Sequence, residues 1–89
     1  KATGFNLFQN EPNPFNDITN IGFALPNSAQ ATLTVYDVTG KVIYQITDTY
    51  SAGEHNLKVN KADLSVTGMM YYTLESSGYT ATKKMIVIE

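Results

Sequence analysis

Residues 68–89 read Gly68-Met-Met-Tyr-Tyr-Thr-Leu-Glu75, Ser76-Ser-Gly78 and Tyr79-Thr-Ala-Thr-Lys-Lys-Met-Ile-Val-Ile-Glu89. Two runs rich in aromatic and β-branched residues flank a short turn that contains glycine, which predicts a β-hairpin beginning at Gly68. Residues 85–88 are consecutive and apolar, and such a strand is typical of a sheet covered on both faces. The rest of the chain must then supply a second layer, and we expect a β-sandwich.

The composition limits the class of protein. With 89 residues the chain is long enough for one domain, which we expect over residues 1–89. The absence of cysteine excludes a disulfide framework, a thiolate zinc site and a cysteine nucleophile. A net charge of −2, with six basic residues spread along the chain, argues against a nucleic-acid partner.

The ends of the chain suggest a fragment of a longer protein. The first residue is Lys1, and residues 1–10 lack the basic and then apolar layout of a signal peptide. No apolar run approaches the ~20 residues that span a bilayer. We therefore expect a domain from the C-terminal end of a larger protein.

A proline-rich stretch, Asn10-Glu-Pro-Asn-Pro-Phe-Asn-Asp17, predicts a stiff corner. The two prolines lack backbone donors and hold the residues before them extended, so this stretch cannot be a central strand. The Phe15 ring follows at a point where it can close the corner against the core. The Asn16 and Asp17 side chains can form turns. The oxygens of the Asn/Asp cluster leave a calcium site open as the alternative, although the spacing matches no calcium-loop template. The residues assigned to this structural motif are Pro12, Asn13, Pro14, Phe15 and Asn16.

Alternating apolar and polar residues predict the remaining strands. Beyond a short lead at residues 5–8, these strands cover residues 19–25, 30–37, 41–50 and 54–60. Gly40 supplies a turn between two of them, so that residues 30–37 and 41–50 pair as a hairpin, and Gly53 breaks the chain before the next strand. Residues 61–65 are long enough only for one helical turn. The expected core comprises Ile21, Phe23, Leu25, Leu33, Val35, Val42, Ile46, Leu57, Val59, Leu74, Ile86 and Ile88.

About seven short strands, with turns every 8–12 residues, predict the fold class. This spacing is typical of an all-β, immunoglobulin-like antiparallel β-sandwich. Membership of the antibody family itself is excluded, since the chain has neither the paired cysteines nor the tryptophan of that family.

No motif in the sequence predicts catalysis. His55, the single histidine, lies at the end of an apolar strand face and has no partner at a catalytic or metal-ligand spacing. A Gly-x-Ser-x-Gly elbow and a glycine-rich phosphate loop are both missing. We therefore expect no enzyme activity, cofactor, metal or small-molecule substrate. Tyr36, Tyr71 and Tyr79 fit cross-strand packing best, with an aromatic platform for sugar as the alternative.

Six blocks of the sequence together resemble a known family. In chain order they are Asn10-Glu-Pro-Asn-Pro-Phe-Asn16, Ile21-x-Phe-x-Leu-Pro26, Val35-Tyr-Asp-Val-Thr-Gly-Lys-Val42, Ala52-Gly-x-His55, residues 68–74, and Thr82-Lys-Lys-Met-Ile-Val-Ile88. The ordered set closely resembles the type A C-terminal sorting domain of the type IX (Por) secretion system. The resemblance covers nearly all of residues 10–89, after a lead-in at residues 1–9.

This resemblance implies a noncatalytic secretion signal rather than an enzyme. Family members stand at the C-terminus of cargo proteins of Bacteroidetes-type bacteria. The cargo folds in the periplasm, is recognised at the outer membrane through this domain, and reaches the cell surface or the medium. A sortase-like peptidase commonly removes the domain. The alternative function is a structural or carbohydrate-binding domain appended to an extracellular enzyme.

The resemblance also bears on single residues. The family usually has the sequence Gly-x-Tyr-x-Tyr, in which the glycine corresponds to Gly68. Here Tyr72 matches the second tyrosine, whereas Met70 replaces the first. The candidate partner-recognition residues lie at the end of the chain, where the outer-membrane machinery would bind the terminal strand by strand addition or by charge pairing. They are Lys83, Lys84, Met85, Ile86, Val87, Ile88 and Glu89. The two lysines would otherwise be gatekeepers against aggregation.

Overall fold

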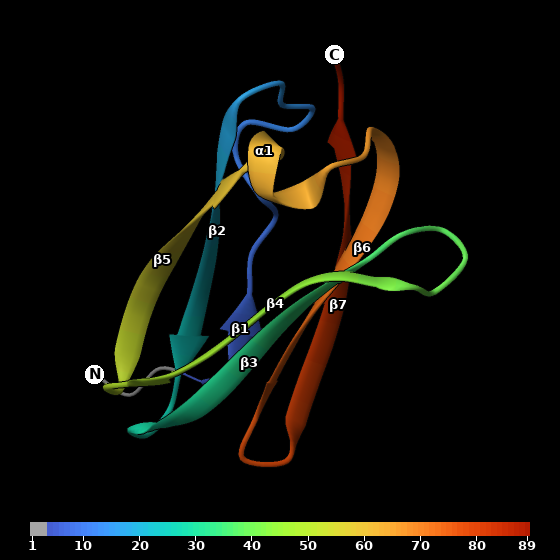
Figure 1. Cartoon of the computed structure of the whole chain (residues 1–89). Coiled ribbons are helices and arrows are strands. Elements are labelled where there is room, and N and C mark those ends of the chain that lie inside the picture. The colour runs from blue at the N-terminus through green and yellow to red at the C-terminus, as the bar shows by residue number, and fades with distance from the viewer. Residues whose placement is uncertain (1–3) are drawn as a thin grey trace.

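The computed structural model describes residues 4–89, which form two antiparallel β-sheets packed face to face (Figure 1). The strands are β1 (Asn6–Leu7), β2 (Ile18–Leu25), β3 (Ala29–Tyr36), β4 (Val42–Tyr50), β5 (Gly53–Asn60), β6 (Gly68–Ser76) and β7 (Tyr79–Val87). A single helical turn, α1 (Lys61–Leu64), lies between β5 and β6, as predicted. Within residues 4–89, no helix is long and apolar enough to cross a membrane.

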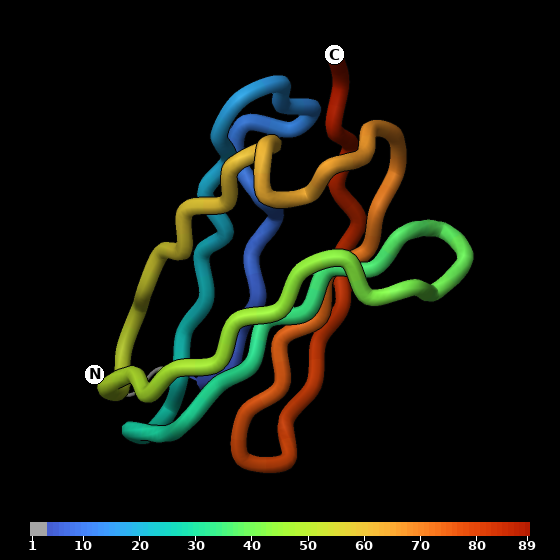
Figure 2. The backbone as a smooth tube through the Cα atoms, viewed as in Figure 1, coloured from blue at the N-terminus to red at the C-terminus, as the bar shows by residue number. Residues whose placement is uncertain are grey.

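The strands are divided between a small sheet and a large sheet. The small sheet has the order β1-β2-β5, and the large sheet has the order β4-β3-β6-β7. Figure 2 follows the chain from β2 in the small sheet to β3 and β4 in the large sheet, back to β5, and finally to the β6–β7 hairpin. The predicted all-β sandwich of seven strands is confirmed.

The core lies between the two sheets and follows the predicted alternation in most strands. In β2 and β3 the inward side chains include Phe23, Leu33 and Val35, all of them buried. Of the twelve expected core residues, Ile21, Phe23, Leu25, Leu33, Val35, Val59 and Leu74 are buried, and Ile46 and Leu57 are partly buried against the core. Phe15 adds to the core from the corner, as predicted, and Leu64 adds to it from α1.

The prediction for Val42 was wrong, since its side chain is 49% exposed. The pairing of β3 with β4 shifts by one residue between Val35 and Tyr36, so that Tyr36 lies opposite Val42 and Ile43 is the extra residue. Such a β-bulge reverses the faces of the residues beyond it. Val42 therefore points outward beside Tyr36, and Ile43 packs against the core instead.

The predictions for Ile86 and Ile88 were also wrong, because these residues are 41% and 45% exposed. The buried residues of this run are Met85 and Val87. Met85 pairs with Met70 of β6, whose side chain is buried in the same core. Four consecutive apolar residues carry no alternation, so only this pairing fixes which of them face inward. Moreover, β7 is an edge strand with an exposed outer face and not a strand covered on both faces.

Candidate recognition surface

The terminal hairpin is closed by a two-residue turn at Ser77 and Gly78. Both residues have positive φ, at 50° and 85°. Two successive positive φ values match the twist of the flanking strands, which favours a tight hairpin and a fixed register. The register continues to the pair of Gly68 and Val87. The turn therefore determines which side chains of β7 reach solvent.

The outer face of the large sheet carries an apolar cluster around a lysine. Val42, Tyr36, Tyr71 and Lys84 lie opposite one another in a row across all four strands, and Met69 and Ile86 form the next pair. We call these six residues the outer patch. Met69 is 42% exposed, similar to Ile86 and Val42, and Lys84 is also exposed. The patch thus combines exposed apolar surface with a cation.

The edge of β7 is covered by residues 8–15, which we call the strap. The Phe15 N–H donates to the Ile86 carbonyl at 3.1 Å, and the Ile88 N–H donates to the Phe15 carbonyl at 2.9 Å. The Asn13 Oδ1 accepts from the Ile86 N–H at 2.9 Å, and the Gln9 Nε2 donates to the Lys84 carbonyl at 2.6 Å. Four backbone groups of residues 84–88 that would otherwise face solvent at this edge are therefore paired.

Inside the strap, Asn10 and Thr19 form a buried polar pair. The Asn10 Nδ2 donates to the Thr19 Oγ1 at 3.0 Å and to the Pro12 carbonyl at 3.2 Å, and the Thr19 hydroxyl donates to the same carbonyl at 2.9 Å. Both residues are almost completely buried. Since a buried polar group is costly when it lacks a partner, this network holds the corner in one conformation.

Tyr72 fastens the strap to the large sheet from within the core. Its hydroxyl donates to the Phe8 carbonyl at 2.7 Å and accepts from the Asn10 N–H at 2.9 Å. The side chain is fully buried. Burial raises the pKa of Tyr72 from 10.0 to about 12, and the hydrogen bond from Asn10 lowers that pKa only in part. The tyrosine that matches the family motif thus connects the two ends of the domain.

Replacing Tyr72 by phenylalanine is expected to reduce the free energy of unfolding by about 1–3 kcal/mol, because the buried Asn10 N–H and the Phe8 carbonyl lose their partner. Urea denaturation measures this difference. Tyr71→Phe is the matched control, since the Tyr71 side chain lies on the outer face, and it should change stability by less than about 0.5 kcal/mol. Equal losses in the two variants would contradict the role of Tyr72.

Alkaline pH is expected to destabilise the domain through the same residue. Folding raises the pKa of Tyr72, so the neutral phenol stabilises the folded state below pH ~10, and that stability is lost as the pH rises toward ~12. Thermal unfolding of the intact domain and of Tyr72→Phe, followed across this range, checks the expectation. The melting temperature of the intact domain should fall more steeply than that of the variant, and parallel curves would contradict it.

The structure also places the other predicted motif residues. Pro12, Asn13, Pro14 and Asn16 are exposed on the corner, and Gly40, Gly53 and Gly68 have positive φ values of 91°, 112° and 108°. At the turn of Gly40, the Asp37 Oδ1 accepts hydrogen bonds from the Thr39 hydroxyl and N–H and from the Lys41 N–H. The bond from the Thr39 hydroxyl is the largest cause that lowers the pKa of Asp37. This turn lies at the end of β3, next to the bulge that exposes Val42.

The seven candidate recognition residues are not brought together on one surface. Lys84 and Ile86 belong to the outer patch, while Ile88 and Glu89 are exposed beyond the end of β7. Met85 and Val87 lie in the core, and Lys83 is half-buried opposite Tyr72. A partner of the folded domain can therefore touch only part of the predicted set.

Sequence reasoning missed the residues that fix the strap. Gln9, Asn10 and Thr19 were not singled out, and Asn13 was assigned only to the structural motif of the corner. The position of Thr19 could have been inferred from the sequence. Alternate residues of a strand share a face, so Thr19 faces inward with the buried Ile21 and Phe23. A polar residue at an inward position requires a partner, and here that partner is Asn10.

The three tyrosines considered as a sugar platform do not share one surface. Tyr36 lies opposite Tyr71 on the outer face of the large sheet, which fits cross-strand packing. Tyr79 is at the other end of the hairpin, where its ring stacks on Phe5 with a centroid distance of 5.1 Å. The structure thus provides no joint platform for these rings.

His55 takes part in aromatic packing. Its ring lies 5.4 Å from Phe23 and 5.1 Å from Tyr50, and its Nε2 is 2.8 Å from the Ser51 carbonyl oxygen. In the part of the chain that the structure describes, no group of three or more His, Cys, Asp or Glu side chains could hold a metal ion. These contacts describe a packed histidine at the rim of the core.

Comparisons with known proteins agree with this arrangement. The chain matches the family described as the secretion system C-terminal sorting domain over residues 12–88, a range that includes the corner and the terminal hairpin. Among solved structures, the sensor domain of the anti-sigma factor RsgI4 from Pseudobacteroides cellulosolvens is similar, with a TM-score of 0.56 and 9% identity over 99% of this chain and 98% of that chain. This likeness concerns the fold alone. No curated protein matches the chain. Because the family match spans most of its residues, the chain belongs to the C-terminal sorting domains of the type IX secretion system.

Proposed function

We propose that this domain is a noncatalytic signal that directs an attached cargo protein across the outer membrane, and that the secretion machinery reads it through the outer patch. Membership of the family implies interaction with the type IX machinery and with a cargo on the N-terminal side. It also implies export to the cell surface or the extracellular space. The patch is the part of the proposal that rests on this chain's own geometry.

The observation that carries this proposal is the exposure of apolar side chains around Lys84. The largest contiguous apolar patch on a monomeric protein is often an interaction site. The cluster includes Met69 and Ile86, which belong to the terminal hairpin and flank the position of Lys84. A partner surface that is apolar at its centre and acidic at its rim would be complementary.

The strap favours recognition of this face over strand addition at the edge of β7. An added strand needs unpaired backbone donors and acceptors along the edge. Between Lys84 and Ile88, four of these groups are already bonded to Gln9, Asn13 and Phe15. Strand addition there would first have to displace the strap, whereas the outer patch is accessible in the folded domain.

The finer steps of export are part of the same proposal. The cargo folds in the periplasm, the folded domain is recognised at the outer membrane, and a sortase-like peptidase then removes the domain from the cargo. The domain itself has no catalytic role in this sequence of events. Its contribution is a folded surface that the machinery can recognise after synthesis is complete.

Fusion to a reporter tests the proposed function. Residues 1–89 are joined to the C-terminus of a reporter that folds in the periplasm, in a bacterium with a type IX system and in a strain lacking its outer-membrane translocon. The reporter should reach the surface only in the first strain and remain periplasmic in the second. Equal retention of fused and unfused reporter in the first strain would contradict a sorting function.

A further inference from the structure

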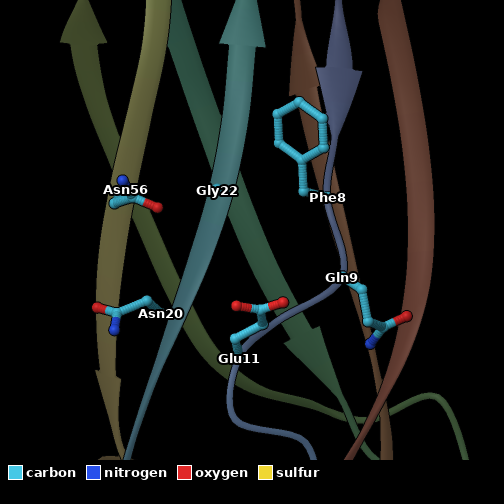
Figure 3. A pocket seen from close by; sticks show the side chains of 6 residues that line it. All are labelled: Phe8, Gln9, Glu11, Asn20, Gly22 and Asn56. Carbon is cyan, nitrogen blue, oxygen red and sulfur yellow. The ribbon is translucent and has the colours of Figure 1, made fainter.

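A polar cleft lies on the outer face of the small sheet, away from the outer patch. Its volume is about 550 Å³, and it is lined by Phe8, Gln9, Glu11, Asn20, Gly22 and Asn56. Figure 3 shows the Glu11 side chain between those of Asn20 and Gln9, with the Phe8 ring farther along the same face. The Phe8 side chain is 42% exposed. Proposed recognition by the secretion machinery involves none of these side chains.

Backbone hydrogen bonds fix the positions of the lining residues. Glu11 and Asn20 exchange two bonds of 3.0 Å and 2.8 Å, and the Phe8 N–H donates to the Gly22 carbonyl at 2.9 Å. Asn56 is held opposite Gly22 by the pairing of β2 with β5. Three separate chain segments thus present their side chains from a rigid frame, and a preorganised site loses less entropy on binding.

Gly22 leaves space at the centre of the cleft. A Cβ atom added there would lie 3.2 Å from the Asn56 Oδ1 and 3.3 Å from the Phe8 Cδ2. Both contacts are tighter than ordinary van der Waals contact, so the cleft has its present shape because this residue has no side chain.

The chemistry of the lining selects a class of ligand. Among the lining residues described by the structure, the single charged group is the Glu11 carboxylate, which disfavours phosphate and other anions. Amide side chains offer both donors and acceptors, whereas a carboxylate only accepts. In residues 4–89, the side chains of Glu11, Asn20 and Asn56 are not used in hydrogen bonds within the protein. Hydroxyl groups complement such a set.

We infer that this cleft binds a neutral saccharide, with the Phe8 ring against the C–H face of a sugar and with Glu11, Asn20 and Asn56 bonded to its hydroxyls. The volume lies within the range of small-ligand sites. One exposed ring and an open polar cleft predict weak binding, with a Kd on the order of 1 mM. This site is distinct from the proposed recognition surface, since none of its lining residues belongs to the outer patch.

Titration of the ¹⁵N-labelled 89-residue chain tests the inference by backbone amide shifts in NMR spectra. The probes are three neutral hexasaccharides, of β-1,4-glucose, β-1,3-glucose and β-1,4-xylose, and one anionic probe, a hyaluronan hexasaccharide. At least one neutral probe should shift the amides of Phe8, Glu11, Gly22 and Asn56, and the anionic probe should bind more weakly. No shifts with any neutral probe at about 10 mM, or shifts confined to the large sheet, would overturn the inference.

Three variants and one matched control assign the binding to this cleft. Phe8→Ala, Glu11→Gln and Gly22→Ala should each raise Kd at least about tenfold, because they remove the ring, remove the acceptor charge or fill the centre of the cleft. Glu54→Gln removes a carboxylate from the same sheet but outside the cleft, and it should leave Kd unchanged. Thermal melts confirm that each variant is folded. A loss with Glu54→Gln equal to that with Glu11→Gln would contradict the site.

Discussion

Val87→Asp is expected to remove much or all of the stability of the folded state, whereas Ile86→Asp leaves the domain folded. The Val87 side chain is 1% exposed and the Ile86 side chain is 41% exposed, although the two are neighbours in sequence. An unpaired buried carboxylate costs more than about 4 kcal/mol, and a domain of this size has a free energy of unfolding of roughly 4–13 kcal/mol. Far-UV circular dichroism and thermal melts distinguish the two variants.

The same pair tests the register of β7 against the predicted one, in which Ile86 and Ile88 face the core. Val87→Ile is the control for the position, because a larger apolar side chain should cost about 1–3 kcal/mol and keep the fold. If Ile86→Asp unfolds the domain and Val87→Asp does not, the faces of β7 are the reverse of those described above.

Phe15→Ala is expected to reduce the free energy of unfolding by about 3–5 kcal/mol. Its ring is 2% exposed in the core, and its backbone bonds hold the strap against β7. Phe8→Ala is the matched control from the same strap, since its side chain is 42% exposed, and the cost should stay below about 1 kcal/mol. Urea denaturation gives both differences.

Amide hydrogen exchange adds a second measurement of the Phe15 variant. The N–H groups of Ile86 and Ile88 are bonded to Asn13 and Phe15, respectively. Loss of the ring should loosen the strap, so these two amides should exchange faster by a larger factor than amides in the centre of β3. A uniform acceleration across the sheets would mean that Phe15 contributes only to global stability.

Much of the fold could be predicted from local patterns. Apolar residues recur at every second position from Ile21 to Leu25 and from Ala31 to Val35, so these buried positions followed directly from period-2 spacing. The two prolines and Phe15 predicted a corner closed by a buried ring, and the ring is buried. These features depend on residues close together in the chain, which is why sequence alone was sufficient.

The errors arose where a distant strand decides the outcome. Val42 was assigned inward because the sequence of β4 gives no indication of the one-residue bulge that its pairing with β3 introduces. The faces of residues 85–88 depend on pairing with Met70 and Gly68, because a run of consecutive apolar residues does not show which of them face inward. The hydrogen bonds between the strap and β7 join residues more than 70 positions apart. No local pattern specifies such contacts.

This structure also changes the choice of variants for testing recognition. Truncation after Thr82 would remove Met85 and Val87 from the core, so a loss of export could reflect unfolding alone. Substitutions at exposed positions avoid this problem. Lys84→Glu combined with Ile86→Asp alters the outer patch without touching a buried side chain.

Surface delivery of the fused reporter by the Lys84→Glu/Ile86→Asp variant tests most directly whether the secretion machinery recognises the outer patch. The matched control is Lys58→Glu/Ile18→Asp, which makes the same changes at exposed positions of the small sheet. Placing a glutamate opposite an acidic partner costs several kcal/mol of binding free energy. Each ~1.4 kcal/mol weakens binding tenfold. The patch variant should therefore deliver at least about tenfold less reporter while its melting temperature stays close to that of the intact domain, and the control should deliver the intact level. Delivery of the folded patch variant at the intact level would contradict recognition through the outer patch.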